Sequence, residues 1–337
     1  PTPAPAPSPR PRAKALCLIS GGLDSQLAAC VLREQGVHVE GVAFSSPFFS
    51  PDAAIRAAKQ LDIKLHVVDF TPHIAALLKN PPHGFGSCLN PCIDCHAAMV
   101  RKASEIMARE GFDFIATGEV LGQRPMSQRR DALNMVQKDS GIPGRLLRPL
   151  SAQLLPETEP ETLGLVDRSR LLGLSGRNRK PQLEMAKRFG LVEFPTPAGG
   201  CLLTEPNYTR RLKNLMEHEG LDDERLLRLL AHGRHFRLDA GTLAIVGRNR
   251  GDNEFIRTAM RGGDALETLE ALIMTHNRMG GTLINMNVVS KEQILEAHED
   301  PMTHPDLMIR VTGYSAYFRS LSREYRQPIV DRILAEG

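Results

Sequence analysis

Tryptophan is absent from this chain of 337 residues, and aromatic residues make up only 5% of it. A surface that stacks successive bases of a single strand needs several aromatic rings, so that class of site is disfavoured. The chain also lacks any run of about 18 apolar residues, which excludes a membrane-spanning helix. Its formal net charge is only +3, so wholesale coating of nucleic acid is disfavoured, whereas a local basic face is compatible with it.

A hydrophobic fraction of 42% excludes disorder throughout, and the length predicts two or three domains. Residues 1–13, PTPAPAPSPRPRA, carry no acid and are rich in Pro and Ala, which predicts an extended tail before the fold. This start is not a hydrophobic segment, so we expect no disulfide scaffold among the six cysteines.

Short apolar runs alternate with helical patterns after this tail. Strands are expected at 15–19, 37–44, 64–70 and 112–118, and helices between the first two strands up to Gly36, at 52–61 and at 97–110. This alternation predicts an α/β fold whose parallel sheet has helices on both faces, with a ligand at the carboxyl ends of the strands. Farther along, a helix at 215–230 and a strand at 242–249 are expected.

The turn between the first strand and the first helix reads Ser20-Gly21-Gly22-Leu23-Asp24-Ser25. Glycines let backbone N–H groups approach an anion, and a helix N-terminus adds positive potential. The serine hydroxyls can donate to phosphate oxygens, and Asp24 can help to hold Mg²⁺. The alternative is an ordinary turn capped by Ser and Asp side chains.

SGGLDS resembles the signature of the PP-loop ATP pyrophosphatase superfamily, whose members adenylate a carbonyl oxygen and release pyrophosphate. The resemblance implies that ATP is bound, with Mg²⁺, by Ser20, Gly21, Gly22, Leu23, Asp24 and Ser25. It also implies that Thr117 and Gly118, followed by Glu119 at the end of the fourth strand, shape the nucleotide site. Asp24 is then a catalytic residue as well as a binding residue.

Four of the six cysteines are candidates for sulfur or metal chemistry. Cys88, Cys92 and Cys95, followed by His96, come just before the helix expected at 97–110, and Cys201 follows a Pro-Ala-Gly-Gly turn. A thiol near a helix N-terminus is expected to have a lowered pKa.

Three kinds of cysteine site are compatible with this spacing. Cys92, Cys95 and Cys201 could ligate a 4Fe–4S cluster, or Cys95 and Cys201 could form a persulfide and resolving pair without metal. Zinc is the third option, since the cysteines together with His96 exceed four ligands. Cys17 and Cys30 fit buried structural thiols.

The stretch from Cys88 to Glu119 resembles the corresponding part of tRNA thiouridine synthetases, over about residues 14–205. These enzymes activate a uridine carbonyl with ATP and replace its oxygen by sulfur. The resemblance implies tRNA and a sulfur donor, either sulfide or a persulfide carrier, as partners, and Cys95 and Cys201 as catalytic residues. Cys88 is an additional cysteine without an assigned role.

Basic residues are frequent in the loosely patterned region after the fourth strand and could neutralise tRNA phosphates. Val246–Ile256 resembles the small RNA-binding NFACT-R domain, which is assigned to residues 201–263 after a thiolation domain at 14–200. The candidate RNA-binding residues are Arg129, Arg130, Arg177, Arg179, Lys180, Arg248 and Arg250.

Residues 264–337 resemble the C-terminal segment of glycyl radical enzymes such as pyruvate formate-lyase. The motif is RVTGYSA, in which Gly313 is the candidate radical site because only glycine leaves its Cα without a side chain. The chain has no room for the large lyase barrel, so this part resembles the small autonomous glycyl-radical proteins that replace a damaged lyase tail. The resemblance implies a radical-SAM activating enzyme and a glycyl radical lyase as partners. If both halves of the chain are active, their oxygen sensitivity predicts an anaerobic host and a cytoplasmic protein.

The function expected from these patterns is an ATP-dependent tRNA sulfurtransferase that carries a glycyl-radical module. The alternative is a glycyl-radical spare part whose N-terminal domain is regulatory.

Overall fold

A computed structural model describes residues 13–195, 201–237, 243–247, 274, 291–311 and 314–335. The chain divides into two compact units, residues 1–261 and 262–337, and each is described by itself. The extended tail expected at the N-terminus lies almost entirely outside the described residues and stays a prediction. The domain boundaries expected near residues 200 and 263 also stay predictions.

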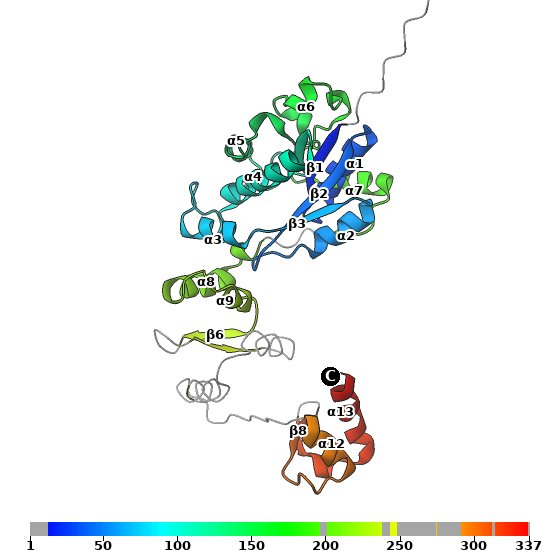
Figure 1. Ribbon diagram of the computed structural model, residues 1–337, viewed down its shortest axis with the longest axis vertical. Coiled ribbons are helices and arrows are strands. Elements are labelled where there is room, and N and C mark those ends of the chain that lie inside the picture. Colours follow the sequence, from blue (N-terminus) through cyan, green and yellow to red (C-terminus); the bar gives the residue numbers. More distant parts are fainter. Residues whose placement is uncertain are drawn as a thin grey trace, which may run out of the picture. The chain divides into compact units, whose positions relative to one another are not determined.

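A five-stranded parallel sheet forms the centre of the first unit (Figure 1), in the order β3-β2-β1-β4-β5. Its strands are β1 (Lys14–Leu18), β2 (His38–Ser45), β3 (Leu65–Asp69), β4 (Phe114–Thr117) and β5 (Leu146–Leu147). The first four agree with the strands expected from the sequence, which confirms the α/β fold class. β1 is central because it pairs with β2 on one side and with β4 on the other, so the loop that follows it lies in the middle of the sheet's carboxyl edge.

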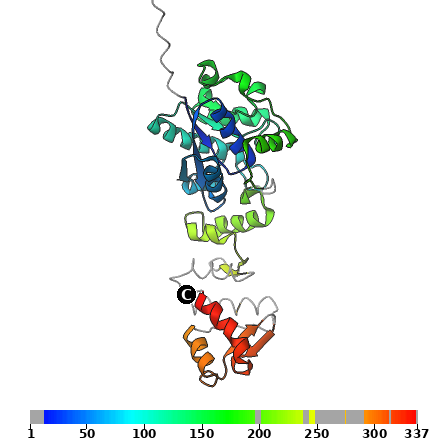
Figure 2. The ribbon, with the colours of Figure 1, turned by 90° about the vertical axis from the view of Figure 1, so that its right-hand side faces the viewer.

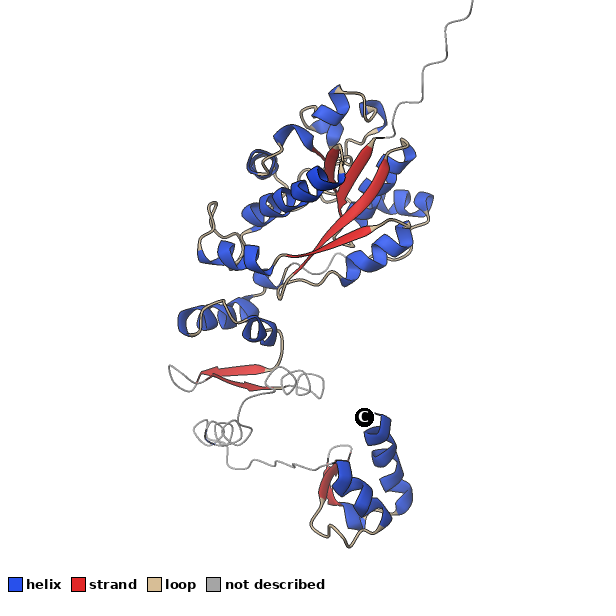
Figure 3. Ribbon diagram, viewed as in Figure 1, coloured by secondary structure: helices blue, strands red, loops and turns tan. Residues whose placement is uncertain are grey.

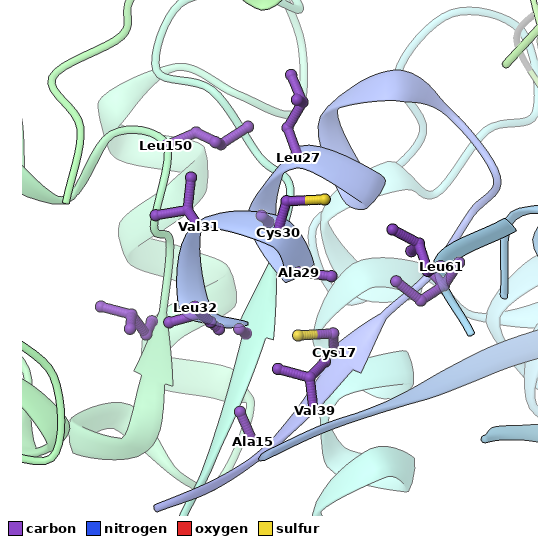
Figure 4. Close-up of a cluster of buried hydrophobic side chains, with 14 of the residues drawn as sticks. Ala15, Cys17, Leu27, Ala29, Cys30, Val31, Leu32, Val39, Leu61 and Leu150 are labelled. Atoms are coloured by element: carbon purple, nitrogen blue, oxygen red, sulfur yellow. The ribbon is translucent and has the colours of Figure 1, made fainter. Parts of the chain in front are cut away.

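Helices cover both faces of this sheet (Figure 3), as expected. One face packs against α1 (Leu23–Glu34), α2 (Asp52–Leu61) and α7 (Lys180–Phe189). The other packs against α3 (Thr71–Lys79), α4 (Cys92–Glu110) and α5 (Arg130–Asp139). Figure 4 shows Cys17 and Cys30 within the first core, and burial raises the pKa of these thiols to about 12 and about 11. Their expected structural role agrees with this burial.

Helix α4 begins at Cys92 and not at Ala97, where the sequence pattern placed its start. Pro91 occupies the residue before the helix, and Asp94 in its first turn accepts hydrogen bonds from the backbone N–H and the ring Nδ1 of His83, at 3.0 and 2.6 Å. The CxxC pair therefore lies on the first turn of the helix. Gly111 ends it in the left-handed region, at φ +71°.

The expectation of one helix at 215–230 is wrong. The chain instead forms α8 (Pro206–His218) and α9 (Glu224–Leu229), separated at Gly220, whose φ is +82°. The Asp223 side chain starts α9 by accepting a hydrogen bond from the N–H of Arg225. Leu212 and Leu215 of α8 pack into the same core as α4, so this segment is not separate from the sheet.

The remaining short elements complete the described part of the first unit, which Figure 2 shows turned by 90°. β6 (Arg234–Arg237) pairs antiparallel with β7 (Leu243–Val246), within the strand expected at 242–249. The short helices are α6 (Glu159–Thr162) and the 3₁₀ turns Pro143–Arg145, Ala152–Leu154, Arg168–Arg170 and Leu202–Thr204.

The second unit contains a helix, a hairpin and a second helix. These are α12 (Lys291–Glu299), β8 (Met308–Val311), β9 (Tyr314–Tyr317), the 3₁₀ turn Phe318–Ser320 and α13 (Arg323–Ala335). Phe318 is fully buried in its small core. Arg326 of α13 donates to the carbonyl oxygens of Ala297 and His298 at the end of α12, at 3.0 and 3.2 Å, which is a favourable place for a cation.

None of the helices in the described ranges is long and apolar enough to cross a membrane.

Candidate functional site: a nucleotide loop beside three cysteines

The SGGLDS loop follows β1 at the carboxyl edge of the sheet. Gly22 is the N-cap of α1, and no side chain caps this helix. The Ser and Asp side-chain caps expected for the alternative, an ordinary turn, are therefore not formed in this loop. Ser25 donates to the carbonyl of Gly22 at 2.8 Å, and the exposed Ser20 accepts from the N–H of Gly22 at 3.3 Å. The first amides of α1 are thus free of a side-chain cap and suited to an anion.

Gly21 cannot be replaced without moving the backbone. Its φ is +82°, and a Cβ there would lie 2.3 Å from the carbonyl carbon of Ala53 on α2. The loop therefore fits between α1 and α2 only because this residue has no side chain.

One carboxylate oxygen of Asp24 accepts a hydrogen bond and the other does not. Oδ2 accepts from Gln123 Nε2 at 2.7 Å, and Gln123 Oε1 accepts from Gln182 at 3.3 Å. Oδ1 is buried and has no hydrogen-bond partner among the described residues. A buried carboxylate oxygen without a partner suits a cation, so the residue expected to hold Mg²⁺ fits that ion.

The end of β4 touches the same loop. A Cβ on Gly118 would lie 2.4 Å from the backbone nitrogen of Ser25, so glycine permits this close approach. The buried Thr117 donates its hydroxyl to Glu119 at 3.0 Å. The two residues expected to shape the nucleotide site therefore lie beside the loop. The Thr117 hydroxyl uses its one hydrogen in the bond to Glu119.

Glu119 links this edge to the cysteine helix. Its carboxylate accepts from His96 Nδ1 at 3.0 Å and from Arg148 Nε at 2.8 Å. Burial alone would raise the pKa of Glu119, but the charge of Arg148 and the bond from His96 outweigh it and lower the pKa to about 2. Glu119 is therefore a buried anion that orients the imidazole next to Cys95. The residues were visible in the sequence, but nothing in their spacing indicated that they meet.

Cys92, Cys95 and Cys201 come together although they are far apart in the chain. Cys92 and Cys95 lie on the first turn of α4, and Cys201 precedes the turn Leu202–Thr204. A backbone hydrogen bond of 3.2 Å from Leu89 to Leu203 ties the two segments. The thiols lie within electrostatic range, since both Cys92 and Cys201 influence the pKa of Cys95.

The expectation of lowered thiol pKa values is wrong for this geometry. Burial raises the pKa of Cys95 well above its usual range, with smaller contributions from Cys201 and Cys92. Burial also raises the pKa of Cys92 and brings that of Cys201 to about 11. The helix N-terminus is present, but these thiols are removed from water, which disfavours the thiolate. Their ionisation therefore needs a metal or a nearby base.

The positions of the cysteines favour one of the two metal sites expected from the sequence, the 4Fe–4S cluster over the zinc ion. In the described part of the chain, the cysteines and His96 do not place three ligand atoms within 4.8 Å of one another, as one zinc ion would require. A 4Fe–4S cluster binds each thiolate to a different iron, so three thiols from two segments suit it in number and kind. Cys88 is exposed and adopts a left-handed backbone conformation, with φ +58°.

The basic residues occupy two neighbouring segments. Arg129 and Arg130 are exposed at the start of α5, where Arg129 pairs with Asp131 at 2.9 Å. Arg177 and Lys180 are exposed, and Arg179 is half-buried, at the start of α7. A bridge between Leu121 and Ser175 joins the chain segments that lead to these two groups. Arg248 and Arg250 lie outside the described residues.

Two glutamines connect the nucleotide loop by hydrogen bonds to the segment that leads to Cys201. Neither was predicted from the sequence as a site residue. Gln26 Nε2 donates to the carbonyl oxygens of Gly21 and Glu193, both at 3.0 Å. Gln60 donates to Gln26 Oε1 at 2.7 Å and accepts from the N–H groups of Val192 and Glu193. The loop and this segment are therefore fixed to each other.

In the second unit, Gly313 and the preceding Thr312 lie outside the described residues. The strands around them are described. Val311 of β8 pairs with Tyr314 of β9.

Two protein families match different parts of the chain. The family described as thiamine biosynthesis protein (ThiI) matches residues 11–153, and the family described as glycine radical matches residues 247–319. The second match begins within the segment assigned above to an NFACT-R-like domain, and that assignment stays a prediction.

Curated relatives follow the same division. A probable tRNA sulfurtransferase of Anoxybacillus flavithermus is 34% identical over 145 residues, which cover 40% of this chain and 34% of that protein. A formate acetyltransferase of Haemophilus influenzae is 42% identical over 58 residues, 17% of this chain and 8% of that protein. The chain thus spans about a third of the length of the sulfurtransferase.

Among solved structures, a 4-thiouridine synthetase–RNA complex with bound ATP matches with 26% identity and a TM-score of 0.38, covering 53% of this chain and 41% of that one. On the family matches, the chain carries a ThiI-type PP-loop domain over residues 11–153 and a glycine radical domain over residues 247–319.

Proposed function

We propose that this chain is an ATP-dependent tRNA sulfurtransferase. The loop at Ser20–Ser25 binds ATP, the AMP group is transferred to the carbonyl oxygen of a uridine, and pyrophosphate is released. Oxide is a poor leaving group and AMP is a good one, so adenylation prepares the uridine carbon for attack by sulfur. The similarity to proteins named tRNA sulfurtransferase supports this reaction class.

One observation carries the proposal. Two consecutive residues just after β4 connect the two chemical halves of the site: Gly118 lies against the nucleotide loop, and Glu119 holds the imidazole next to Cys95. A uridine activated at the loop would therefore be close to the cysteines. A site that only hydrolysed ATP would need no thiols beside it.

Different residues bind the phosphates of ATP, the magnesium ion and the tRNA. Gly21, Gly22 and Leu23 present α1 amides to the pyrophosphate portion of ATP, with Ser20 as a hydroxyl donor. Ser25 becomes a second donor when its hydroxyl turns from the Gly22 carbonyl to a phosphate oxygen. Asp24, through its unpartnered oxygen, holds Mg²⁺, which neutralises phosphate charge when bound. Thr117 and Gly118 border the nucleotide. Positive charges at Arg129, Arg130, Arg177, Arg179 and Lys180 attract tRNA phosphates without reading sequence.

Two routes for sulfur remain alternatives. In the first, Cys92, Cys95 and Cys201 hold a 4Fe–4S cluster, which would supply an iron with an open position for a sulfur ligand. In the second, a persulfide carrier transfers its outer sulfur to one thiol of the Cys95–Cys201 pair and leaves as a thiol. The new persulfide attacks the adenylated uridine carbon and AMP leaves; the other cysteine then releases the thiouridine by forming a Cys95–Cys201 disulfide, which an external thiol reduces. Sulfide as the donor belongs to the first route. Raised thiol pKa values are compatible with either, because a cluster ionises its ligands and a pair needs a base.

The test compares two aspartates that occupy first turns of neighbouring helices. Asp24→Asn should lower the rate of AMP and pyrophosphate formation by about a hundredfold or more, because the cation ligand is lost. Asp52→Asn changes an exposed aspartate in the first turn of α2 and should have no effect. Thiouridine in the tRNA product is measured in the same reactions. Equal activity of the two variants would contradict the nucleotide assignment.

Purification without oxygen, followed by iron and sulfide assays, distinguishes the two routes for sulfur. About four iron atoms and matching sulfide per chain, lost in Cys201→Ser, support the cluster. Iron-free protein that still thiolates tRNA supports the persulfide pair.

We propose as a second activity that Gly313 carries a glycyl radical, installed by a radical-SAM activating enzyme, and that the unit serves a glycyl radical lyase. The match to the glycine radical family and the β8–β9 hairpin around this residue support it. Since oxygen destroys such a radical, we place the protein in the cytoplasm of an anaerobe. Activation should give an EPR doublet and oxygen-dependent cleavage at Gly313, both absent in Gly313→Ala. Intact wild-type protein after confirmed activation would refute this activity.

A further inference from the structure

A second cluster of chemically active side chains lies at the opposite edge of the sheet. Glu40 is near the amino end of β2, His66 near the amino end of β3, and Glu110 ends α4. The nucleotide loop follows the carboxyl end of β1, so this cluster is separate from the site described above.

The three side chains converge closely. His66 Nε2 lies 2.7 Å from Glu40 Oε2 and 3.6 Å from Glu110 Oε2, and one ligand atom of each residue lies within 4.8 Å of the others. In the described part of the chain, no other group of three His, Cys, Asp or Glu residues meets that spacing. The spacing is small enough for one ion to touch all three.

The scaffold holds these groups in place. Val42 pairs with His66 across the parallel strands, and Glu40 lies two residues before Val42, so Glu40 and His66 project from the same face of the sheet. The His66 ring packs edge-on against Phe112, with 6.3 Å between ring centroids. His66 and Glu40 side chains are only 12% and 16% exposed. Their arrangement is therefore largely set before any ligand binds.

A lysine ammonium group already occupies the position that a bound metal ion would take between the two carboxylates. Lys64 Nζ lies 3.2 Å from Glu40 Oε2 and 3.2 Å from Glu110 Oε2, the same two oxygen atoms that face His66. The Lys64 side chain is 61% exposed, so it can swing into solvent when another cation takes its place. His38 contacts the second oxygen of Glu40 at 3.3 Å and can serve as a further nitrogen donor.

We propose that Glu40, His66 and Glu110 form a zinc site, with Lys64 as a built-in competitor. An imidazole nitrogen with two carboxylates is a donor set typical of Zn²⁺, whereas Mg²⁺ prefers oxygen ligands alone. Because the site joins β2, β3 and the end of α4, bound zinc stabilises the folded first unit and takes no part in the reaction.

The test uses the full chain, freed of metal and kept reduced, and titrates it with zinc by calorimetry. Any zinc taken up by the thiols of Cys92, Cys95 and Cys201 is the same in every protein compared, so it cancels in the difference. His66→Gln should lose one equivalent of bound zinc and the zinc-dependent rise in melting temperature. If zinc binding and melting are the same in wild type and His66→Gln, the site is not a zinc site.

Lys64→Met gives a second test that does not risk the fold, because this side chain is largely exposed. Loss of the competing charge should tighten zinc binding at this site by about fivefold. Lys102→Met removes a lysine that pairs with Glu105 on the surface of α4, and it should leave zinc binding unchanged. Equal zinc affinity in Lys64→Met and Lys102→Met would overturn the proposal, even if His66→Gln failed to fold.

Discussion

Replacing Gly21 by alanine tests the close contact on which the nucleotide loop depends. Two costs are expected. Placing a side chain at φ +82° costs about 1–2 kcal/mol. A methyl group 2.3 Å from the Ala53 backbone forces α1 or α2 to move, and overpacking of this kind costs about 1–3 kcal/mol more.

Gly36 provides a matched control, because its φ is +84° and no atom lies within 4 Å of the position of its Cβ. Gly36→Ala should therefore show the first cost alone. Urea unfolding of both variants measures the difference, and ATP affinity should fall only in Gly21→Ala. If the two variants lose the same stability, the close approach of the loop to α2 is wrong.

Three further predictions concern other side-chain contacts. Glu119→Gln leaves Arg148 without its counter-ion and should cost about 3–5 kcal/mol. The pKa of Glu119 is lowered to about 2, so the stabilisation that its charge gives is present above about pH 4.5 and is lost as the pH falls towards 2. The free energy of unfolding should therefore fall less between these pH values in Glu119→Gln than in the wild type. Arg326→Met removes two hydrogen bonds at the end of α12 and should destabilise the second unit by about 1–3 kcal/mol, which hydrogen exchange can localise. Gln60→Ala should speed alkylation of Cys201, and an unchanged rate would mean that the glutamine contacts do not restrain this segment.

The sequence predicted the elements whose signals are local. Alternating apolar runs located β1–β4, and Gly36 and Gly111 marked helix ends because a left-handed conformation favours glycine. The SGGLDS loop was located by its place between a strand and a helix. The start of α4 was misplaced because the pattern of apolar residues begins after the CxxC pair, whereas the helix begins with it.

Long-range contacts could not be predicted in this way. The meeting of His96, Glu119 and Arg148 depends on how three distant segments pack. The thiol pKa values were predicted with the wrong direction, because the helix N-terminus is visible in the sequence and the burial of Cys95 is not. The same limit applies to Glu40 and His66, whose proximity follows from the pairing of β2 with β3.

The most direct test of the proposed sulfurtransferase follows the fate of ATP labelled in its α-phosphate. The protein is incubated without oxygen with a tRNA transcript, Mg²⁺ and sulfide. We expect labelled AMP and an equal amount of pyrophosphate, formed only when tRNA is present and lost in Asp24→Asn. Labelled ADP, or AMP formed equally without tRNA, would contradict it.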